Sequence, residues 1–160
     1  MKSTIVVFGS STGTCENIAN TIAEKLGVEA INVTDFSADT IANHDNLILG
    51  TSTWGAGELQ DDWYDGVNVL KDADLSGKTV AIFGCGDSES YSDTFCAAMK
   101  EIYDAAEGAN IIGSISTDGY TFDDSDAVVD GKFIGLPLDD VNEDDKTEGR
   151  IDAWLDSIKG

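Results

Sequence analysis

Short apolar runs alternate along the chain with segments in which apolar residues recur at helical spacing. The apolar runs, rich in Ile and Val, predict strands at residues 4–8, 30–33, 47–51, 79–84 and 111–115. The segments with helical spacing predict helices at residues 15–26, 59–71, 93–106 and 148–159. Such alternation is typical of an α/β protein. We expect one domain, residues 1–160, built on a doubly wound five-stranded parallel sheet with helices on both faces.

The strands differ in a way that predicts where a ligand binds. The runs around Ile5, Leu47 and Val80 are apolar almost throughout, as expected of central strands that are covered on both faces. Residues 30–33 are short and mixed, like an edge strand. In doubly wound sheets, ligands bind at the carboxyl ends of the strands, where the strand order reverses. The loops after the first, third and fourth strands are therefore the candidate site.

The alternation stops between Asp118 and Glu148, a stretch that holds 11 of the 31 acidic residues and only Lys132 and Lys146 as basic residues. A solvated, partly disordered insertion has this composition. The apolar run at residues 131–138 nevertheless indicates ordered structure. We expect the whole stretch to be an insertion within or after the fifth strand.

Charge and cysteine content narrow the classes of function. The chain has 31 acidic against 9 basic residues, and its formal net charge of -22 disfavours nucleic acid and anionic membranes and favours basic protein partners. No apolar stretch reaches the ~20 residues of a membrane span, and the first residues predict a strand rather than a signal peptide, so we expect a cytoplasmic protein. Cys15, Cys85 and Cys96 include no CxxC pair, so neither a disulfide framework nor a metal site is expected.

The first loop has the pattern of a phosphate site. Ser10, Ser11, Thr12 and Thr14 surround Gly13, and the loop opens directly into a helix. Backbone N–H groups and hydroxyls at the positive end of a helix dipole bind phosphate. An ordinary capped turn is the alternative, although four hydroxyls exceed what one N-cap needs.

Known phosphate and nucleophile motifs do not fit the chain. The first loop has no Lys after Gly13 and lacks the GxGxxG pattern, which excludes an NTPase P-loop and a dinucleotide loop. A phosphatase loop that starts at Cys15 would need Arg at position 21, which is Thr21. His44, the single histidine, precedes the third strand at the opposite end of the sheet. We expect His44 to be structural, and we expect no catalytic residues.

The second and third loops each carry an aromatic residue where a ligand would lie. Trp54 stands beside Gly55 after the third strand, and Tyr91 follows Asp87 after the fourth. Either ring alone could close the edge of the core. Together with the phosphate loop, the two rings predict a flat, phosphorylated heterocycle stacked between them. Asp87 is a candidate acceptor for a ring N–H of that ligand.

These motifs resemble those of flavodoxins. The resemblance rests on residues 10–14, on Thr53 and Trp54 with residues 57–60, and on residues 84–87 with Tyr91, and it spans essentially the whole chain. The acidic insertion is similar to the extra segment of the long-chain subgroup. The resemblance implies a flavodoxin-like sheet with strand order 2-1-3-4-5 and one FMN held without a covalent bond.

The resemblance also implies which residues bind the cofactor. One set contacts the phosphate, a second flanks the flavin ring, and a third lies in the loops that meet the polar edge of the ring. At the phosphate they are Ser10, Ser11, Thr12, Gly13, Thr14 and Cys15; beside the ring they are Trp54 and Tyr91; in the loops that meet the polar edge they are Thr51, Ser52, Thr53, Gly55, Ala56, Cys85, Gly86 and Asp87. The peptide between Gly55 and Ala56 would turn its carbonyl toward flavin N5, which gains a proton with the first electron.

On this resemblance we expect a low-potential one-electron carrier that acts in place of ferredoxin, as a monomer and not as an enzyme. Its partners would be basic redox proteins, such as a ferredoxin/flavodoxin–NADP reductase or a pyruvate oxidoreductase. An FMN-dependent quinone or NAD(P)H reductase-like enzyme is the alternative, and it would need a substrate pocket over the flavin. Trp54 and Tyr91 are expected on the two faces of the ring, which leaves its edge for electron exchange.

Cys15 departs from the family pattern, in which Thr is usual at this position. A thiol is a weaker hydrogen-bond donor than a hydroxyl. Cys15→Thr should therefore tighten FMN binding modestly, by up to about 1.5 kcal/mol for one added hydrogen bond. Fluorescence titration of the apoprotein measures the change. Unchanged or weaker binding would mean that Cys15 points into the core.

Overall fold

The computed structural model describes residues 4–9, 14–54, 58–59, 63–85, 99–116, 127–129, 131–138 and 144–159. The strands of its main sheet are β1 (Thr4–Gly9), β2 (Glu29–Asn32), β3 (Asn46–Trp54), β4 (Glu58–Leu59), β5 (Thr79–Cys85), β6 (Asn110–Ile112) and β10 (Leu136–Leu138). Its helices are α1 (Thr14–Leu26), α2 (Ala38–Ala42), α3 (Trp63–Asp72), α4 (Met99–Ala105) and α5 (Asp144–Lys159), with a 3-10 turn, η1 (Val33–Asp35). No helix within these ranges is long and apolar enough to cross a membrane.

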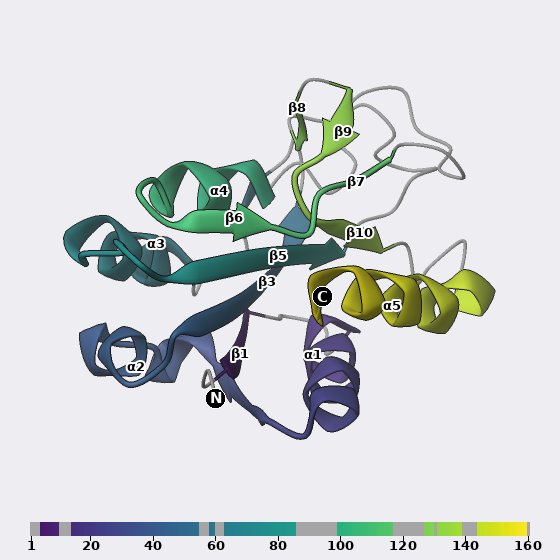
Figure 1. Ribbon diagram of the computed structural model, residues 1–160, viewed down its shortest axis with the longest axis horizontal. Helices are drawn as coiled ribbons and strands as arrows, with labels where there is room; N and C mark the ends of the chain where they lie inside the picture. The colour runs from purple at the N-terminus through teal and green to yellow at the C-terminus, as the bar shows by residue number, and fades with distance from the viewer. Residues whose placement is uncertain are drawn as a thin grey trace.

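The main sheet has the order β10-β5-β3-β1-β2, and all pairs along this path are parallel (Figure 1). Counted as five strands, with β6 and β10 as the two parts of the fifth, this is the predicted order 2-1-3-4-5. β1, β3 and β5 lie in the centre and β2 forms an edge, as their apolar patterns predicted. The fold class expected from the sequence is therefore confirmed.

The two faces of the sheet are covered by different helices because successive side chains of a strand point to opposite faces. Ile5 and Val7 of β1 join α2, α3 and α4 in one core, whereas Val6 and Phe8 join α1 and α5 in the other. Figure 1 shows these two groups of helices on opposite sides of the sheet. A slip of one residue would exchange the two faces, so the alternation fixes the register of the central strands.

The fifth strand is divided between β6 and β10, which pair with successive parts of β5. Ile112, the last residue of β6, pairs with Ala81. Leu136, the first residue of β10, pairs with Phe83. The chain therefore leaves the sheet edge after β6 and returns to the same edge only two positions further along β5.

Two glycines flank this division. Gly113 follows β6 with a φ of +88°, a conformation that favours glycine, and its carbonyl accepts a 2.8 Å hydrogen bond from Nε1 of Trp154 in α5. Gly135 precedes β10, and a Cβ on it would lie 2.1 Å from the carbonyl oxygen of Ile82. The chain can leave and rejoin the sheet at these two positions because neither residue carries a side chain.

The chain between β6 and β10 contains a second, antiparallel sheet with the order β7-β9-β8. Its strands are β7 (Ile115–Ser116), β8 (Val128–Val129) and β9 (Lys132–Phe133). Phe133 and Ile134 are buried and join the core that contains α3 and α4. The insertion thus lies within the fifth strand. The expectation that the fifth strand continued to Ile115 is wrong, because Ile115 pairs with Phe133 instead.

Several other predicted boundaries differ from the structure. Leu59 does not begin a helix, because it belongs to β4, and α3 begins at Trp63. Val33 belongs to η1 rather than to β2, and α5 begins earlier than predicted, at Asp144. The five-residue helix α2 was not predicted, because it is too short to show a helical period. The first part of the predicted helix 93–106 lies outside the described residues.

Gly50 provides a test of the close packing of the sheet. A Cβ there would lie 2.0 Å from Cζ of the fully buried Phe83 ring. Gly50→Ala should therefore lower the free energy of unfolding by about 1–3 kcal/mol, because the ring or the strand must shift. Urea unfolding followed by circular dichroism measures the change.

Gly149 is the control for this substitution, since it lies inside α5 and a Cβ on it would meet nothing within 4 Å. Gly149→Ala should raise the free energy of unfolding by about 0.5–1 kcal/mol, the usual gain for Ala over Gly within a helix. A Gly50→Ala protein as stable as the wild type would contradict the tight contact between β3 and the Phe83 ring.

Candidate functional site

The candidate site lies at the carboxyl ends of β1, β3 and β5. Strand pairing places Gly9, Thr51 and Gly84 in one row across the sheet, with Pro137 of β10 next to Gly84. Adjacent strands lie about 4.8 Å apart, so the ends of β1 and β5 lie within roughly 10 Å of each other on the two sides of β3, which continues past this row to Trp54. The loops predicted to bind a ligand are therefore neighbours in space, although they are far apart in the sequence.

The first loop connects β1 to α1. β1 ends at Gly9 and α1 begins at Thr14, so only residues 10–13 lie between them. The buried face of α1 packs on the sheet, which directs the amino end of the helix to the carboxyl edge of β1. Thr14 and Cys15 are the first two helical residues, and they stand at the positive end of the helix dipole. This is the arrangement that a phosphate requires.

The second loop is shorter than the sequence predicted, because β3 continues to Trp54. Ser52 pairs with Cys85 of β5, and Thr53 and Trp54 pair with the two residues of β4. The expectation that β3 ends at residue 51 is therefore wrong. The two arms of this antiparallel pair, Thr53 with Leu59 and Trp54 with Glu58, therefore extend the sheet beyond the row of strand ends.

The third loop begins where β5 ends, at Cys85. Met99, the first residue of α4, is fully buried, and a Cβ on Gly84 would lie 2.6 Å from Met99 Cγ. The start of α4 therefore lies directly against the last residues of β5. Glycine at position 84 leaves the space that Met99 fills.

The structure places the backbone of seven predicted cofactor-binding residues, all in or next to the row of strand ends. They are Thr14, Cys15, Thr51, Ser52, Thr53, Trp54 and Cys85. The other predicted residues lie outside the described part of the chain: Ser10, Ser11, Thr12, Gly13, Gly55, Ala56, Gly86, Asp87 and Tyr91. The side chain of Thr51 is fully buried in the sheet. The contacts of all these residues with a cofactor stay predictions.

Two residues that the sequence analysis did not single out support this edge. Nε1 of Trp63, at the start of α3, donates a 2.6 Å hydrogen bond to the carbonyl oxygen of Gly50 in β3, and the Trp63 side chain is fully buried. Two sequence signals were available. Gly50 interrupts an otherwise apolar strand, and an interior glycine often marks the close approach of another group. Trp63 follows two aspartates directly, where a large aromatic residue starts the apolar face of a helix.

Asp74 and His44 lie at the amino end of the sheet, away from the candidate site. Hydrogen bonds from the backbone and the hydroxyl of Ser76 lower the pKa of Asp74, in the connection between α3 and β5. Nδ1 of His44 lies 2.8 Å from the carbonyl oxygen of Thr40, and the carbonyl of His44 accepts a 2.9 Å hydrogen bond from Lys78. His44 is therefore a structural residue, as predicted.

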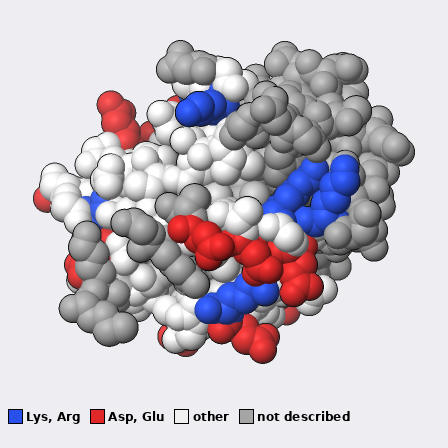
Figure 2. All heavy atoms as spheres, turned by 45° about the vertical axis from the view of Figure 1, so that its right-hand side comes forward, with Lys and Arg blue, Asp and Glu red and all other residues white. Residues whose placement is uncertain are grey.

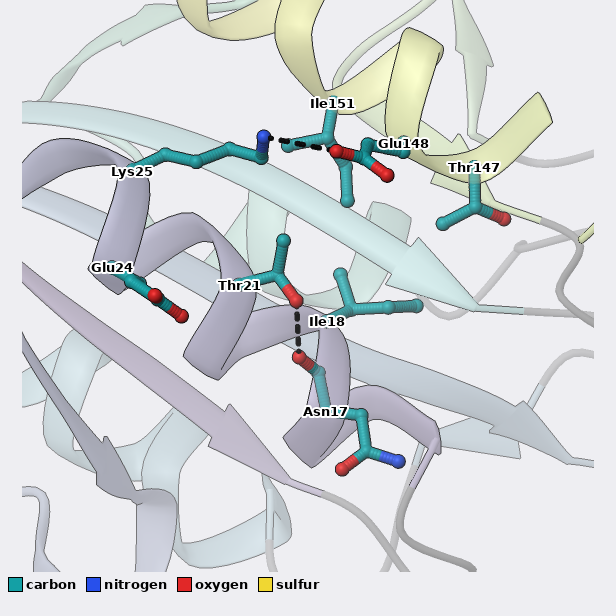
Figure 3. Close-up of a pocket in the computed structure, with 8 residues that line it drawn as sticks. All are labelled: Asn17, Ile18, Thr21, Glu24, Lys25, Thr147, Glu148 and Ile151. Carbon is teal, nitrogen blue, oxygen red and sulfur yellow. Dashed lines mark hydrogen bonds and ion pairs between the residues drawn. The ribbon is translucent and has the colours of Figure 1, made fainter. Parts of the chain in front are cut away.

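A groove of about 670 Å³ lies between α1 and α5 (Figure 3). Thr21 donates a 2.9 Å hydrogen bond to the carbonyl oxygen of Asn17 on its own helix. Nζ of Lys25 lies 2.8 Å from a carboxylate oxygen of Asp152 and 3.5 Å from one of Glu148. The hydrogen bond to Asp152, with the charges of both carboxylates, raises the pKa of Lys25. Two carboxylates already pair with this lysine, so its charge is not available to a phosphate. The ion pairs instead join α1 to α5 across the groove.

The surface over α1 and α5 carries both acidic and basic side chains. Figure 2 shows a band of acidic side chains on this side of the molecule, with basic side chains next to it. The ion pairs of Lys25 with Glu148 and Asp152 on α5 are part of this pattern. Among the described residues, this face therefore carries both signs of charge rather than acidic side chains alone.

Comparison with known proteins decides the family. The chain matches the flavodoxin family model over residues 6–154. The chain belongs to the flavodoxin family. It is 43% identical to "Flavodoxin 1" of Azotobacter vinelandii over 159 residues, which cover 94% of this chain and 91% of that flavodoxin. It is 38% identical to the flavodoxin of Helicobacter pylori over 156 residues, which cover 97% of this chain and 95% of that flavodoxin.

Solved flavodoxin structures have the same fold. The crystal structure of Fusobacterium nucleatum flavodoxin bound to flavin mononucleotide matches with a TM-score of 0.92 and 32% identity, covering 99% of this chain and 98% of that chain. The insertion within the fifth strand agrees with the long-chain subgroup. The family predicted from the motifs of the three loops is therefore confirmed.

Proposed function

We propose that this flavodoxin is a low-potential one-electron carrier that binds one FMN without a covalent bond and acts in place of ferredoxin. The observation that carries this function is the row of Gly9, Thr51 and Gly84, which brings the carboxyl ends of the three strands with the family motifs side by side. Flavodoxins are electron-transfer flavoproteins rather than enzymes. The quinone or NAD(P)H reductase-like activity that the sequence alone left open is not favoured.

The phosphate of FMN fits the first loop by the chemistry of its donors. Ser10, Ser11, Thr12 and Thr14 supply hydroxyls, and the backbone N–H groups at the start of α1 supply further donors. No Lys or Arg lies in this loop or in the first half of α1. Hydrogen bonds and the helix dipole, rather than a cation, would therefore hold the phosphate.

The isoalloxazine ring would lie between Trp54 and Tyr91 at the ends of the central strands. The pairing of β3 with β4 fixes the backbone of Trp54 against Glu58. Gly55 and Ala56 after Trp54, and Asp87 after β5, would meet the polar edge of the ring. The strand ends and the start of the third loop complete the proposed site, with Thr51, Ser52, Thr53, Cys85 and Gly86.

The chain controls the energy of the electrons that its cofactor carries. Bound FMN supplies the one-electron redox chemistry. Two aromatic side chains that exclude water from the ring raise the cost of added negative charge. A net charge of -22 acts in the same direction, because like charges repel most strongly where water is excluded. Together these effects favour a low potential for the second electron.

Membership of the flavodoxin family implies redox partner proteins, and the net charge of this chain indicates that these partners are basic. A net charge of -22 attracts basic surfaces and repels other copies of the chain. We therefore propose a monomer that works in the cytoplasm with basic oxidoreductases, of the ferredoxin/flavodoxin–NADP reductase or pyruvate oxidoreductase type.

Thr12→Val tests the phosphate site. The change removes one hydroxyl at nearly constant volume, so FMN affinity should fall by about 1.5–3 kcal/mol, the contribution of a hydrogen bond to a charged group. Riboflavin has no phosphate, and its affinity should stay nearly unchanged. Fluorescence titration of the apoprotein with both ligands measures the difference. Thr34→Val on exposed η1 is the control and should change neither affinity. Equal losses for FMN and riboflavin would refute the phosphate assignment.

Electron transfer to a basic reductase should slow as salt rises. Screening shortens the range of charge attraction from about 30 Å at 0.01 M to about 10 Å at 0.1 M ionic strength. The second-order rate constant, measured by stopped-flow spectroscopy, should fall at least about tenfold over this range. Reduction of a neutral small-molecule acceptor is the control and should depend little on salt. A flat profile with the reductase would argue against a charge-guided encounter.

A further inference from the structure

We propose that a pocket at the amino end of the main sheet binds a small, flat, neutral molecule with an amide or imide edge, a class that includes nucleobases and other cyclic lactams. The pocket has a volume of about 470 Å³ and lies on the side of the sheet that α1 and α5 cover (Figure 1). Asn46 in the pocket and Thr51 in the row of strand ends are five positions apart along β3, or roughly 16 Å. The pocket is therefore separate from the candidate FMN site.

Four polar side chains, one from each of four neighbouring strands, line this pocket in a single row. They are Thr4 of β1, Asn46 of β3, Thr79 of β5 and Asn110 of β6, and each pairs with the next across the sheet. Neighbouring strands lie about 4.8 Å apart, so the row is roughly 14 Å long. Residues in register point to the same face, and the row therefore presents its side chains together.

The row interrupts a face that is otherwise apolar. Each member stands two positions before a residue that belongs to or packs against the core under α1 and α5, and two of these residues, Ile48 and Ala81, line the pocket themselves. Side chains two positions apart on a strand share a face. Leu26, the last residue of α1, and Ile158, in the last turn of α5, add two half-buried apolar side chains. A bound molecule would therefore meet hydrogen-bonding groups along one side and apolar groups around it, as in most ligand pockets.

The side chains of the row, rather than its main chain, are what a ligand could bind. The backbone N–H groups of Thr79 and Asn110 each donate a 2.9 Å hydrogen bond to a carbonyl oxygen of the neighbouring chain segment. Nδ2 of Asn46 donates a 3.1 Å hydrogen bond to Oγ1 of Thr4, which uses one N–H of this carboxamide and leaves its second N–H and its oxygen. Hydroxyls and carboxamides both donate and accept. An amide or imide edge, in which an N–H stands beside a carbonyl, is the complementary pattern.

The pocket suits a neutral molecule. None of the described residues that line it carries a charge. Two lysines adjoin the pocket in sequence, and both are bound elsewhere. Nζ of Lys25 lies 2.8 Å from a carboxylate oxygen of Asp152, and Nζ of Lys78 donates a 2.9 Å hydrogen bond to the carbonyl oxygen of His44. An ion in the pocket would therefore lose water without gaining a partner of opposite charge, whereas a neutral amide would exchange its water contacts for hydrogen bonds.

Titration of the FMN-bound protein with quinazolinedione, a flat, neutral, two-ring cyclic imide, tests the proposal. Nitrogen–proton correlation NMR spectroscopy should show saturable shifts of the side-chain amide signals of Asn46 and Asn110, with a Kd of about 1 mM or tighter for a ligand of this size. The flavin absorption spectrum should stay unchanged, because the probe binds at the other end of the sheet. No saturable shift, or shifts only at residues beside the row of strand ends, would overturn the proposal.

Thr79→Val removes one hydroxyl of the row at nearly constant volume and keeps a β-branched residue in the strand. The affinity for quinazolinedione should fall about three- to tenfold, the contribution of one hydrogen bond between neutral groups. Asn110→Leu, at an exposed position, should also weaken binding. Thr34→Val on η1 lies outside the pocket and should change nothing. Unchanged affinity in both pocket variants, or an equal loss in Thr34→Val, would overturn the hydrogen-bonding role of the row.

Naphthoate, a flat two-ring anion of similar size, separates the chemistry of the row from the burial of an aromatic ring alone. It should cause no saturable shift in the pocket, because no described lining residue carries a positive charge. Binding of naphthoate as tight as that of quinazolinedione would show that the pocket selects aromatic rings irrespective of charge, and would overturn the proposed class of ligand.

Discussion

The parallel register of β1, β3 and β5 determines the geometry of the functional edge. Gly9, Thr51 and Gly84 share a row only because each strand directs alternate side chains into two different cores. A slip by one residue would place apolar side chains on the wrong face and would also separate the three loops. Burial of the two cores, which is a general stabilising force, therefore also specifies the position of the proposed ligand site.

Large side chains pack closely against glycines in the strands that lead to this edge. The Phe83 ring fills the space beside Gly50, and Met99 fills the space beside Gly84. A Cβ on Gly50 would collide with the Phe83 ring of the neighbouring strand, and a Cβ on Gly84 would collide with Met99 of α4. Close packing of this kind leaves the strands that lead to the candidate site little freedom to shift.

The sequence predicts the central part of this molecule well and its edges poorly, for physical reasons. The apolar runs around Ile5, Leu47 and Val80 identify strands that are covered on both faces, because such strands need no polar side chains. The sequence predicts a helix from Leu59, which belongs to β4 instead, because a two-residue strand has no period of its own. The sequence leaves open whether the insertion lies within or after the fifth strand, because the division of that strand depends on pairing with β5 and on the contact of Trp154 with Gly113. For the site, loop chemistry could be read directly, whereas the role of Trp63 depends on a contact 13 positions back along the chain.

The divided fifth strand also affects how the molecule behaves beside its own copies. A long, flat edge strand presents unpaired main-chain groups to which a strand of another molecule can add. Here that edge consists of two three-residue pieces, and Pro137 in the second piece has no N–H to donate. The opposite edge, β2, is only four residues long. Within the described residues, neither edge offers a ladder on which a second copy could gain many main-chain hydrogen bonds, and such short edges discourage edge-to-edge aggregation.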